Sequence, residues 1–315
     1  MPRPGAVDAA VETLAVDIAA RVRDAVAPSL GDPGARTGVG VAPGGDVTMA
    51  IDEIAEHVVE SMCADAGDIG FYSEDRGYVE FGRPRAILVV DPIDGTRPAA
   101  AGLESCCVSV AVVPPDADAT LGDVQLGIVH EIKSGQRFVA RRGGGVESDA
   151  PVRLSANTDL EALFWTSGLR GRPAMPMTVV LEELIDGSGM HGSFFDLGSA
   201  TFNMTRIVTG QLDAYVDVGR DAVDRFPWLE ETFRRVGNGA VCTNFPYDVA
   251  AAALIVTEAG GVVTRPDGTS IAGHPAVGSG DGFGIAVVAS ASEALHVRLL
   301  EAVDRGMRRL EATRR

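Results

Sequence analysis

The chain has 315 residues, of which 46% are hydrophobic, so it can bury a core in one large domain or in two packed smaller ones. Its formal net charge of −17 and its single lysine, Lys133, make a nucleic acid polymer or an anionic membrane a poor partner. No apolar run is long enough to cross a bilayer, and residues 1–5 lack the basic and apolar regions of a signal peptide, so we expect a cytoplasmic protein.

The first half of the chain predicts two helices followed by strands. Apolar residues recur at helical spacing from Val7 to Val26, and a second helix is expected to begin near Asp52, after a Gly- and Pro-rich loop. Short apolar runs then predict strands at residues 69–73, 85–91, 108–113, 124–132 and 136–141. The run at 85–91 is almost continuously apolar, which is typical of a strand that is buried on both faces.

The second half predicts helices and strands in more even proportion. Strands are expected at residues 162–166, 212–218 and 285–289, and helices at residues 178–185, 199–209, 246–259 and 292–311. Early helices and many strands without regular βαβ alternation indicate an α+β fold. The Gly-rich polar stretch at 143–151 predicts a boundary between an N-terminal subdomain, residues 1–150, and a C-terminal subdomain, residues 151–315.

The cysteines do not suggest a metal site or a disulfide. None forms a C-x-x-C pair, which argues against structural zinc, and we expect reduced thiols. Cys106 and Cys107 are adjacent at a predicted strand, so their side chains should point to opposite faces of a sheet.

The stretch from Asp91 to Thr96, Asp-Pro-Ile-Asp-Gly-Thr, places two carboxylates between a buried strand and a turn. Pro98 suits the first turn of a helix that follows. Carboxylate oxygens bind hard divalent cations, and the free N–H groups of a helix N-terminus bind phosphate, so the stretch offers both halves of a metal-phosphate site. An ordinary Asp-Gly turn with a capping aspartate explains the same residues about as well.

Other acidic residues also lie at the ends of predicted elements. Glu74 and Asp75 follow a strand, Asp52 lies at the start of a helix, and Asp248 lies in a first turn. Taken one at a time, they are explained by a solvated loop, an N-cap and an acid that complements the helix dipole. Together with Asp91 and its neighbours, such acids can hold cations about 3.5–4 Å apart, which clamp both oxygens of an in-line displacement.

In their order along the chain, these motifs resemble those of the inositol monophosphatase superfamily of lithium-sensitive phosphatases. The family pattern is an acid pair after a strand, then D-P-[IL]-D-G-[ST], then W-D-x-A-A followed by E-A-G-G. This chain has Ser73-Glu74-Asp75, Asp91 to Thr96, Tyr247-Asp248-Val249-Ala250-Ala251 and Glu258-Ala259-Gly260-Gly261. The resemblance covers about residues 47–261. It implies the layered αβαβα sandwich of the inositol monophosphatase and fructose-1,6-bisphosphatase type.

The resemblance also implies roles for individual residues. The metal ligands would be Glu74, Asp91, the backbone carbonyl of Ile93, Asp94 and Asp248. The residues that orient and deprotonate the attacking water would be Asp52, Glu74 and Thr96, and Asp52 would also hold a further cation through water. The substrate-binding residues would be Asp94, Gly95, Thr96, Gly198, Ser199, Asp217 and Asp248. The N-terminal subdomain would then carry most metal ligands, and the C-terminal subdomain would complete the substrate site.

The activity implied by the resemblance is hydrolysis of a small phosphate monoester, such as an inositol monophosphate or a sugar phosphate. The attacking water would be activated by about two or three Mg²⁺ ions, for which Mn²⁺ could substitute. The expected partner is a small phosphorylated metabolite, and a homodimer is the usual state of the family. Nucleotide 2′- or 3′-phosphates and histidinol phosphate are alternative substrates. A catalytically silent regulator that binds a phosphorylated ligand is an alternative of a different class.

The chain departs from the family pattern at the site and beside it. Tyr247 replaces the usual tryptophan, and Arg97-Pro98 replaces the usual Asn or Lys-Asn. Residues 219–246 form an insertion, in which we expect one helix at 227–236.

This insertion lies between two predicted site residues, so we expect it to overhang the substrate pocket and to select the leaving group. Its arginines are expected to bind a second phosphate or a polar ring, and Trp228 or Phe233 to pack on a base or to anchor the segment. A solvated surface excursion is the alternative.

Overall fold

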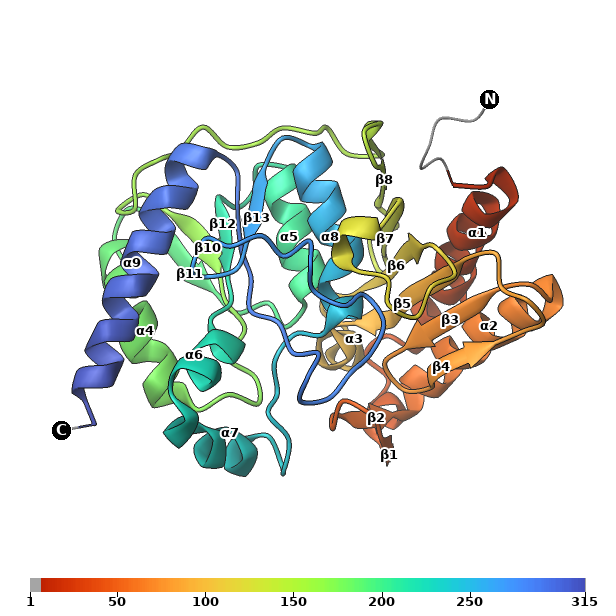
Figure 1. The fold of residues 1–315 in the computed structure, drawn as a ribbon, viewed down its shortest axis with the longest axis horizontal. Coiled ribbons are helices and arrows are strands. Elements are labelled where there is room, and N and C mark those ends of the chain that lie inside the picture. Colours follow the sequence, from red (N-terminus) through yellow and green to blue (C-terminus); the bar gives the residue numbers. More distant parts are fainter. Residues whose placement is uncertain (1–6, 315) are drawn as a thin grey trace.

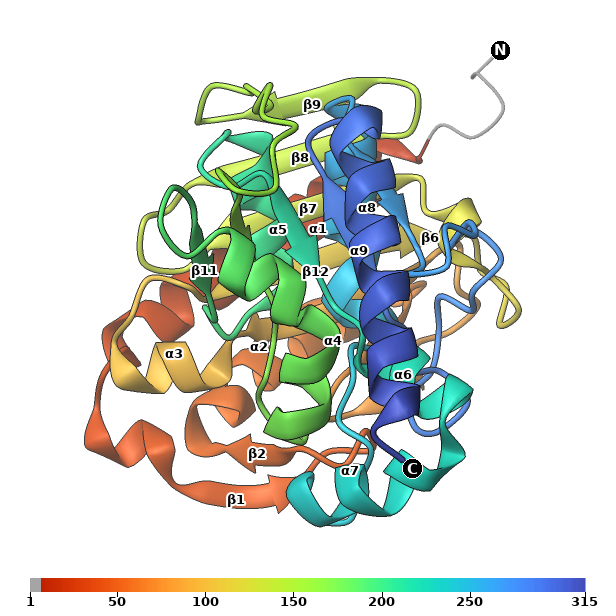
Figure 2. The same ribbon diagram turned by 90° about the vertical axis from the view of Figure 1, so that its left-hand side faces the viewer.

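A computed structural model describes residues 7–314 of the chain, which form alternating layers of helices and sheets (Figure 1). Helices α1 and α2 pack on one face of a seven-stranded sheet, and α8 packs on its other face. Helix α5 packs beside α8 and against a five-stranded sheet, whose far face is covered by the paired helices α4 and α9 (Figure 2). This arrangement confirms the expected α+β fold and its αβαβα layers.

The chain forms the helices of these layers and shorter helices in the connections between them. They are α1 (Ala9–Val26), α2 (Ala50–Ala66), α3 (Thr96–Ala101), α4 (Ala174–Gly187), α5 (Ala200–Val208), α6 (Gly219–Arg225), α7 (Glu230–Val236), α8 (Pro246–Glu258) and α9 (Glu293–Ala312). Short 3₁₀ helices lie in the connections: η1 (Ala27–Ser29), η2 (Pro33–Arg36), η3 (Leu121–Asp123) and η4 (Pro227–Leu229).

The seven-stranded sheet has the spatial order β4-β3-β5-β6-β7-β8-β9, with β3 and β5 parallel and the other neighbours antiparallel. Its strands are β3 (Gly70–Ser73), β4 (Gly77–Glu80), β5 (Ile87–Asp94), β6 (Cys107–Val113), β7 (Leu126–Glu131), β8 (Arg137–Arg141) and β9 (Gly145–Ser148). Every residue of β5 is buried, which the apolar run before Asp91 predicted for the first part of the strand.

The five-stranded sheet has the order β11-β10-β12-β14-β13 and mixes parallel with antiparallel neighbours. Its strands are β10 (Phe164–Thr166), β11 (Ser193–Phe195), β12 (Ala214–Val216), β13 (Val262–Thr264) and β14 (Val288–Ser290). A separate hairpin, formed by β1 (Gly38–Val41) and β2 (Val47–Met49), lies in the predicted Gly- and Pro-rich loop.

The structure adds short elements that the hydrophobic pattern did not predict. Strands β4, β9, β11 and β13 have three or four residues each and include half-buried or exposed positions, so they lack an apolar run. The prediction of one helix in the insertion was wrong: α6 and α7 flank η4, which begins at Pro227. Helix α2 begins at Ala50, so Asp52 lies inside its first turn.

Buried apolar clusters fill the spaces between the layers. Cys106 belongs to the cluster under α1 and α2, whereas Cys107 belongs to the cluster beneath α5 and α8, so the two thiols lie on opposite faces as predicted. The cluster between the five-stranded sheet and α4 and α9 also contains Leu229 and Phe233 of the insertion. Phe233 therefore anchors the insertion to the core.

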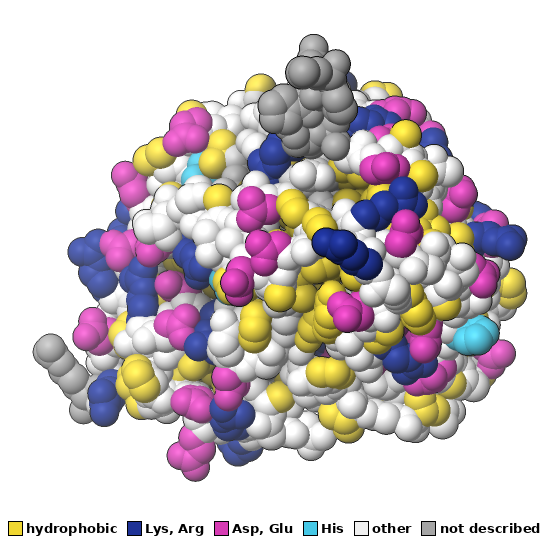
Figure 3. Space-filling view, turned by 45° about the vertical axis from the view of Figure 1, so that its right-hand side comes forward, with side chains coloured by type: hydrophobic (Ala, Val, Ile, Leu, Met, Phe, Trp, Pro, Cys, Tyr) yellow, Lys and Arg dark blue, Asp and Glu magenta, His cyan; other side chains and the backbone are white. Residues whose placement is uncertain are grey.

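The surface carries charges of both signs. On the face in Figure 3, acidic and basic side chains alternate over short distances and form no broad basic patch. Within residues 7–314, none of the helices combines the length and the apolar character that a membrane span requires.

Candidate active site

Strand β5 brings two carboxylates to the same site through a β-bulge. Side chains three residues apart on a regular strand point to opposite faces. The pairing of β5 with β6 shifts register between Asp91 and Asp94, and a bulge of this kind re-aims side chains. One carboxylate oxygen of each residue and one of Asp248 all lie within 4.8 Å of one another.

Gly95 makes the sharp exit from β5 possible. Its φ is +93°, a left-handed conformation that suits glycine. A Cβ at this position would lie 2.4 Å from the carbonyl oxygen of Ser105 and 3.1 Å from Cβ of Ser199. Any side chain here would therefore separate the end of β5 from the start of α5.

The first turns of α5 and α8 hold the third carboxylate beside the other two. Asp248 lies in the first turn of α8 and accepts a hydrogen bond of 2.5 Å from the backbone N–H of Phe245. Asp94 accepts one of 2.6 Å from the backbone N–H of Thr201, whose hydroxyl donates to the carbonyl oxygen of Asp248 at 2.7 Å. The two helices and β5 thus fix the cluster from different layers.

The electrostatics of this cluster favour a bound cation. Burial, followed by the charge of a neighbouring carboxylate, raises the pKa of Glu74 and of Asp91, and raises that of Asp248 to about 8. Burial also raises the pKa of Asp94. Among residues 7–314, no lysine or arginine forms an ion pair with any of these four carboxylates.

The donor atoms also suit a hard cation. The cluster offers carboxylate oxygens and neither imidazole nor thiolate, which matches the preference of Mg²⁺, Mn²⁺ or Ca²⁺ over zinc or copper. The backbone of Ile93 lies within the bulge, where its N–H donates to Asp91 at 3.1 Å. The residues therefore fit a magnesium-type centre.

Asp52 and Thr96 lie beside the cluster. Asp52 is buried, and burial raises its pKa to about 7 although its carboxylate accepts a 2.7 Å hydrogen bond from the backbone N–H of Met49. The hydroxyl of Thr96 contacts both Asp52 and the carbonyl oxygen of Ile93, the latter at 3.1 Å. The single hydroxyl proton donates to only one acceptor at a time, and the hydroxyl can rotate. It can therefore donate to a bound water molecule in place of one of these oxygens.

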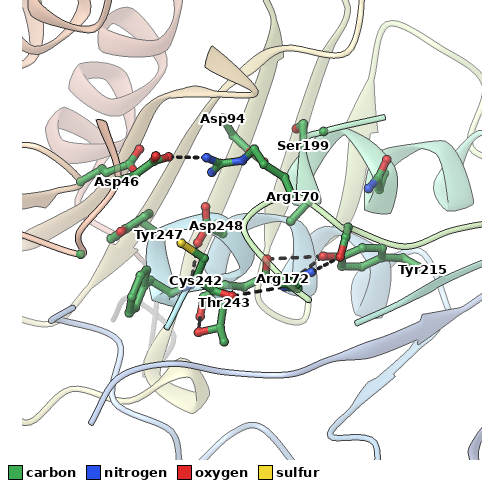
Figure 4. Close-up of a pocket in the computed structure, with 18 of the residues that line it drawn as sticks. Asp46, Asp94, Arg170, Arg172, Ser199, Tyr215, Cys242, Thr243, Tyr247 and Asp248 are labelled. Carbon is green, nitrogen blue, oxygen red and sulfur yellow. Dashed lines mark hydrogen bonds and ion pairs between the residues drawn. The ribbon is translucent and has the colours of Figure 1, made fainter. Parts of the chain in front are cut away.

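A cavity opens beside the carboxylate cluster (Figure 4). The predicted site residues that line it are Glu74, Asp94, Gly198, Ser199 and Asp248. The predicted residues that lie outside its lining are Asp52, Asp91, Ile93, Gly95, Thr96 and Asp217. One residue from each of the three acidic motifs, Glu74, Asp94 and Asp248, therefore lines a single cavity.

Asp217 does not reach the cavity wall. Its side chain is fully buried and pairs with Arg172 at 2.5 Å. It also accepts hydrogen bonds from the backbone N–H of Gly219 at 3.0 Å and from the side chain of Asn244 at 3.1 Å. The predicted contact between Asp217 and substrate is thus replaced in this structure by a contact with Arg172, which does line the cavity.

A cluster of charges that the sequence did not reveal lies at the cavity. Asp46 pairs with Arg170 at 2.8 Å and with Arg97 at 3.1 Å, and Figure 4 shows the first of these pairs across the cavity. Although burial raises the pKa of Asp46, the two guanidinium groups hold it below its usual value. Arg97, which is one of the departures from the family pattern, thus pairs with an acid of the cavity lining.

Further polar residues of the lining were also missed. Asn203, Tyr215 and Asn244 lie at the cavity together with Arg172. Asn203 had a usable signal, because it lies one helical turn after Ser199 and therefore on the same face of the predicted helix. The others come from segments whose approach to the site depends on the packing of the sheets.

None of the four arginines of the insertion, Arg220, Arg225, Arg234 and Arg235, belongs to the lining of the cavity. Arg220 pairs with Asp224 at 2.6 Å, and Arg225 pairs with Asp221 at 3.0 Å. Arg234 pairs with Glu230 at 2.9 Å. The expectation that these arginines bind a second phosphate is therefore not supported.

Only the last part of the insertion meets the cavity. Its residues 242–245 belong to the lining, whereas α6, η4 and α7 do not.

Comparison with known proteins gives a consistent result. The sequence pattern of the inositol monophosphatase family matches residues 8–308. The chain is 29% identical over 272 residues to the fructose-1,6-bisphosphatase/inositol-1-monophosphatase of Methanothermobacter thermautotrophicus, with 82% of this chain and 86% of that protein covered. It is 27% identical over 240 residues to the Nus factor SuhB of Pasteurella multocida, with 75% and 76% covered.

Solved structures resemble this one over nearly the whole chain. The extragenic suppressor protein SuhB of Bartonella henselae gives a TM-score of 0.71 at 21% identity, covering 95% of this chain and all of that one (100%). The Thermotoga maritima IMPase gives a TM-score of 0.67 at 21% identity, covering 94% and 97%. At these identities the likeness supports the fold alone.

Proposed function

Because the chain belongs to the inositol monophosphatase family, we propose that it is a magnesium-dependent phosphatase that hydrolyses a small phosphate monoester. The observation that carries this proposal is the convergence of Asp91, Asp94 and Asp248, with Glu74 in the same cavity and without an ion-pair partner in the described chain. Buried carboxylates this close together repel one another when they are ionised, so a bound cation is what would keep them ionised at neutral pH.

In this proposal, Glu74, Asp91, the carbonyl oxygen of Ile93, Asp94 and Asp248 hold about two or three Mg²⁺ ions, and Mn²⁺ can take their place. When bound, the cations would neutralise the ester and acidify water.

The residues of the chain would do the positioning. The Thr96 hydroxyl orients the attacking water, and the carboxylate of Asp52 or Glu74 accepts its proton. The backbone N–H groups of Gly95 and Thr96 bind the phosphate, and Gly198 and Ser199 contact the alcohol part of the ester. The water oxygen then forms a bond to phosphorus as the bond to the alcohol oxygen breaks on the opposite side, and the leaving alkoxide takes up a proton from solvent. The positive φ of Gly95, which allows this close approach of backbone segments, supports the assignment.

The cavity supports an uncharged, hydroxyl-bearing leaving group. Each arginine in its lining already has a carboxylate partner, Arg170 with Asp46 and Arg172 with Asp217. The same wall also carries neutral polar side chains, and those without a partner in the described chain can hydrogen-bond to hydroxyls. We therefore propose a polyol or sugar monophosphate before a nucleotide phosphate or histidinol phosphate.

The test is phosphate release from a panel that contains an inositol monophosphate, a sugar monophosphate, a nucleotide 3′-phosphate and histidinol phosphate. Each ester is assayed with Mg²⁺ and with excess chelator. We expect release that requires Mg²⁺ and is fastest with the polyol or sugar ester. Release that persists in excess chelator would contradict the metal-dependent mechanism, and absence of release from every ester would contradict the phosphatase proposal.

A regulatory role is the second candidate, because one of the similar proteins is named a Nus factor. In that case the chain would bind a phosphorylated ligand or another protein without turnover. The presence of the whole acidic cluster favours the enzyme. Binding of an ester that is not hydrolysed in the panel above would favour the regulator.

A further inference from the structure

The inner wall of the cavity consists mostly of polar groups that already have partners. Arg172 pairs with Asp217 at 2.5 Å and donates to the carbonyl oxygens of Gly168 and Cys242, the latter at 3.3 Å. Its guanidinium is therefore occupied on several sides. A ligand gains little from this arginine unless it breaks a buried ion pair.

The neighbouring amide and phenol belong to the same network. Asn244 donates from Nδ2 to the hydroxyl of Tyr215 at 3.0 Å and to Asp217 at 3.1 Å. The hydroxyl of Tyr215 lies 3.3 Å from a carboxylate oxygen of Asp217. This network supports the wall, and its atoms are satisfied within the protein.

Asn203 is different. It lies on α5 one turn after the N-cap Ser199, so both side chains face the cavity that they line. The residue is only 2% exposed, and its side-chain oxygen has no hydrogen-bond partner in residues 7–314. Buried carbonyl oxygens are almost always paired, because an unpaired one loses its hydration without compensation.

Asn203 lies on the same helix as a residue that holds the carboxylate cluster. The same first turn of α5 holds Asp94 through the backbone N–H of Thr201 at 2.6 Å. A phosphate ester bound at the carboxylate cluster would thus extend its alcohol part along the wall that carries Ser199 and Asn203.

We propose that Asn203 determines specificity: its side-chain amide hydrogen-bonds to a hydroxyl on the alcohol part of the substrate. The inference rests on the proposed function and assigns a residue that the family motifs do not include. A site built to pair with a hydroxyl discriminates against an ester that lacks one, because the buried oxygen is then left unpaired. Asn203 acts on substrate preference and not on the chemical step.

The experiment compares Asn203→Ala with the unmodified chain on an inositol monophosphate and on phenyl phosphate, which has no free hydroxyl on its alcohol part. The expected result is a loss of about 3- to 10-fold in the ratio of kcat/KM for the polyol ester to that for phenyl phosphate. The kcat/KM for phenyl phosphate should stay within about twofold. Thr243→Val is the matched control, because Thr243 lines the same cavity and its hydroxyl already donates to a backbone carbonyl. Asn203→Ser is the second variant if the alanine variant does not fold.

An equal fall on both esters, or an unchanged ratio, would overturn the inference. Failure of the proposed function is distinct, because it appears as absence of phosphate release from both esters by the unmodified chain. In that case neither ester is hydrolysed. Calorimetry then measures the Kd of each ester, and the ratio of the two Kd values takes the place of the kcat/KM ratio. A change in the Kd ratio that is confined to the Asn203 variants supports the inference, and an equal Kd ratio in all variants overturns it.

Discussion

The ion pair between Arg172 and Asp217 offers a quantitative test of how the inner wall is supported. Asp217→Asn keeps the size of the side chain and removes its charge, which leaves the guanidinium of Arg172 buried without a counter-ion. The carboxylate is fully buried, and it also accepts hydrogen bonds from Gly219 and Asn244.

Removing one partner of a buried ion pair typically costs about 3–5 kcal/mol of unfolding free energy. At the low end of the range for large chains, about 2 °C per kcal/mol, the melting temperature should fall by about 6–10 °C. The cost arises from the unpaired cation, so replacing both partners should cost much less than the sum of the single changes.

The assay is urea unfolding in excess chelator, so that metal binding does not contribute to stability. The assay compares the unfolding free energies of four proteins: the unmodified chain, Asp217→Asn, Arg172→Met and the double variant Arg172→Met with Asp217→Leu. A loss below about 1 kcal/mol for Asp217→Asn, or a double variant as unstable as the sum of the singles, would refute the reasoning.

Other residues give further tests. Asp94→Asn should lower the turnover number by more than about 100-fold while the circular dichroism spectrum stays native, because this residue is proposed to bind metal from a bulge and does not fill a core; unchanged turnover would exclude it as an essential ligand. Burial lowers the pKa of His296 below 6.5, so its contribution to stability is full above pH 6.5 and is lost as pH falls toward the folded-state pKa. The unfolding free energy of His296→Gln should therefore fall less steeply than that of the unmodified chain below pH 6.5, by up to about 1.4 kcal/mol per pH unit, and equal slopes in denaturant titrations would contradict this. Tyr247→Phe should leave the unfolding free energy of the metal-free chain unchanged or raise it by about 1 kcal/mol. The reason is that the Tyr247 hydroxyl is buried without a partner in residues 7–314, whereas its ring, which the variant keeps, packs on Tyr72. A clear loss of stability would show that the hydroxyl makes an interaction.

Local sequence patterns predicted most of the elements that carry the site. The continuous apolar run before Asp91 predicted a buried strand, and Pro246 with Gly260-Gly261 predicted the limits of α8. These features depend on the preferences of neighbouring residues, which act in the same way wherever the chain folds. The family motifs then predicted which acids belong together, and the structure brings Asp91, Asp94 and Asp248 within reach of one cation.

The insertion shows a signal that was present and was not weighed. Its arginines stand four residues from acids, as in Arg220 with Asp224 in α6 and Glu230 with Arg234 in α7. Pairs at this spacing neutralise one another on the helix surface, so they leave little charge for a ligand. The spacing of these pairs therefore favoured the alternative that this part of the insertion is a solvated surface excursion.

Tertiary structure alone decided how the site is shaped around the acids. The bulge between Asp91 and Asp94 depends on the register with β6, and the partner of Asp217 comes from the loop after β10. The pair of Asp46 with Arg170 likewise joins segments from the two halves of the chain. Such contacts form where the two sheets and their helices pack. Their partners are far apart in the sequence, so no local sequence pattern predicts them. The sequence by itself therefore determined which residues can bind a cation, whereas packing determined which polar groups are left free to recognise the substrate.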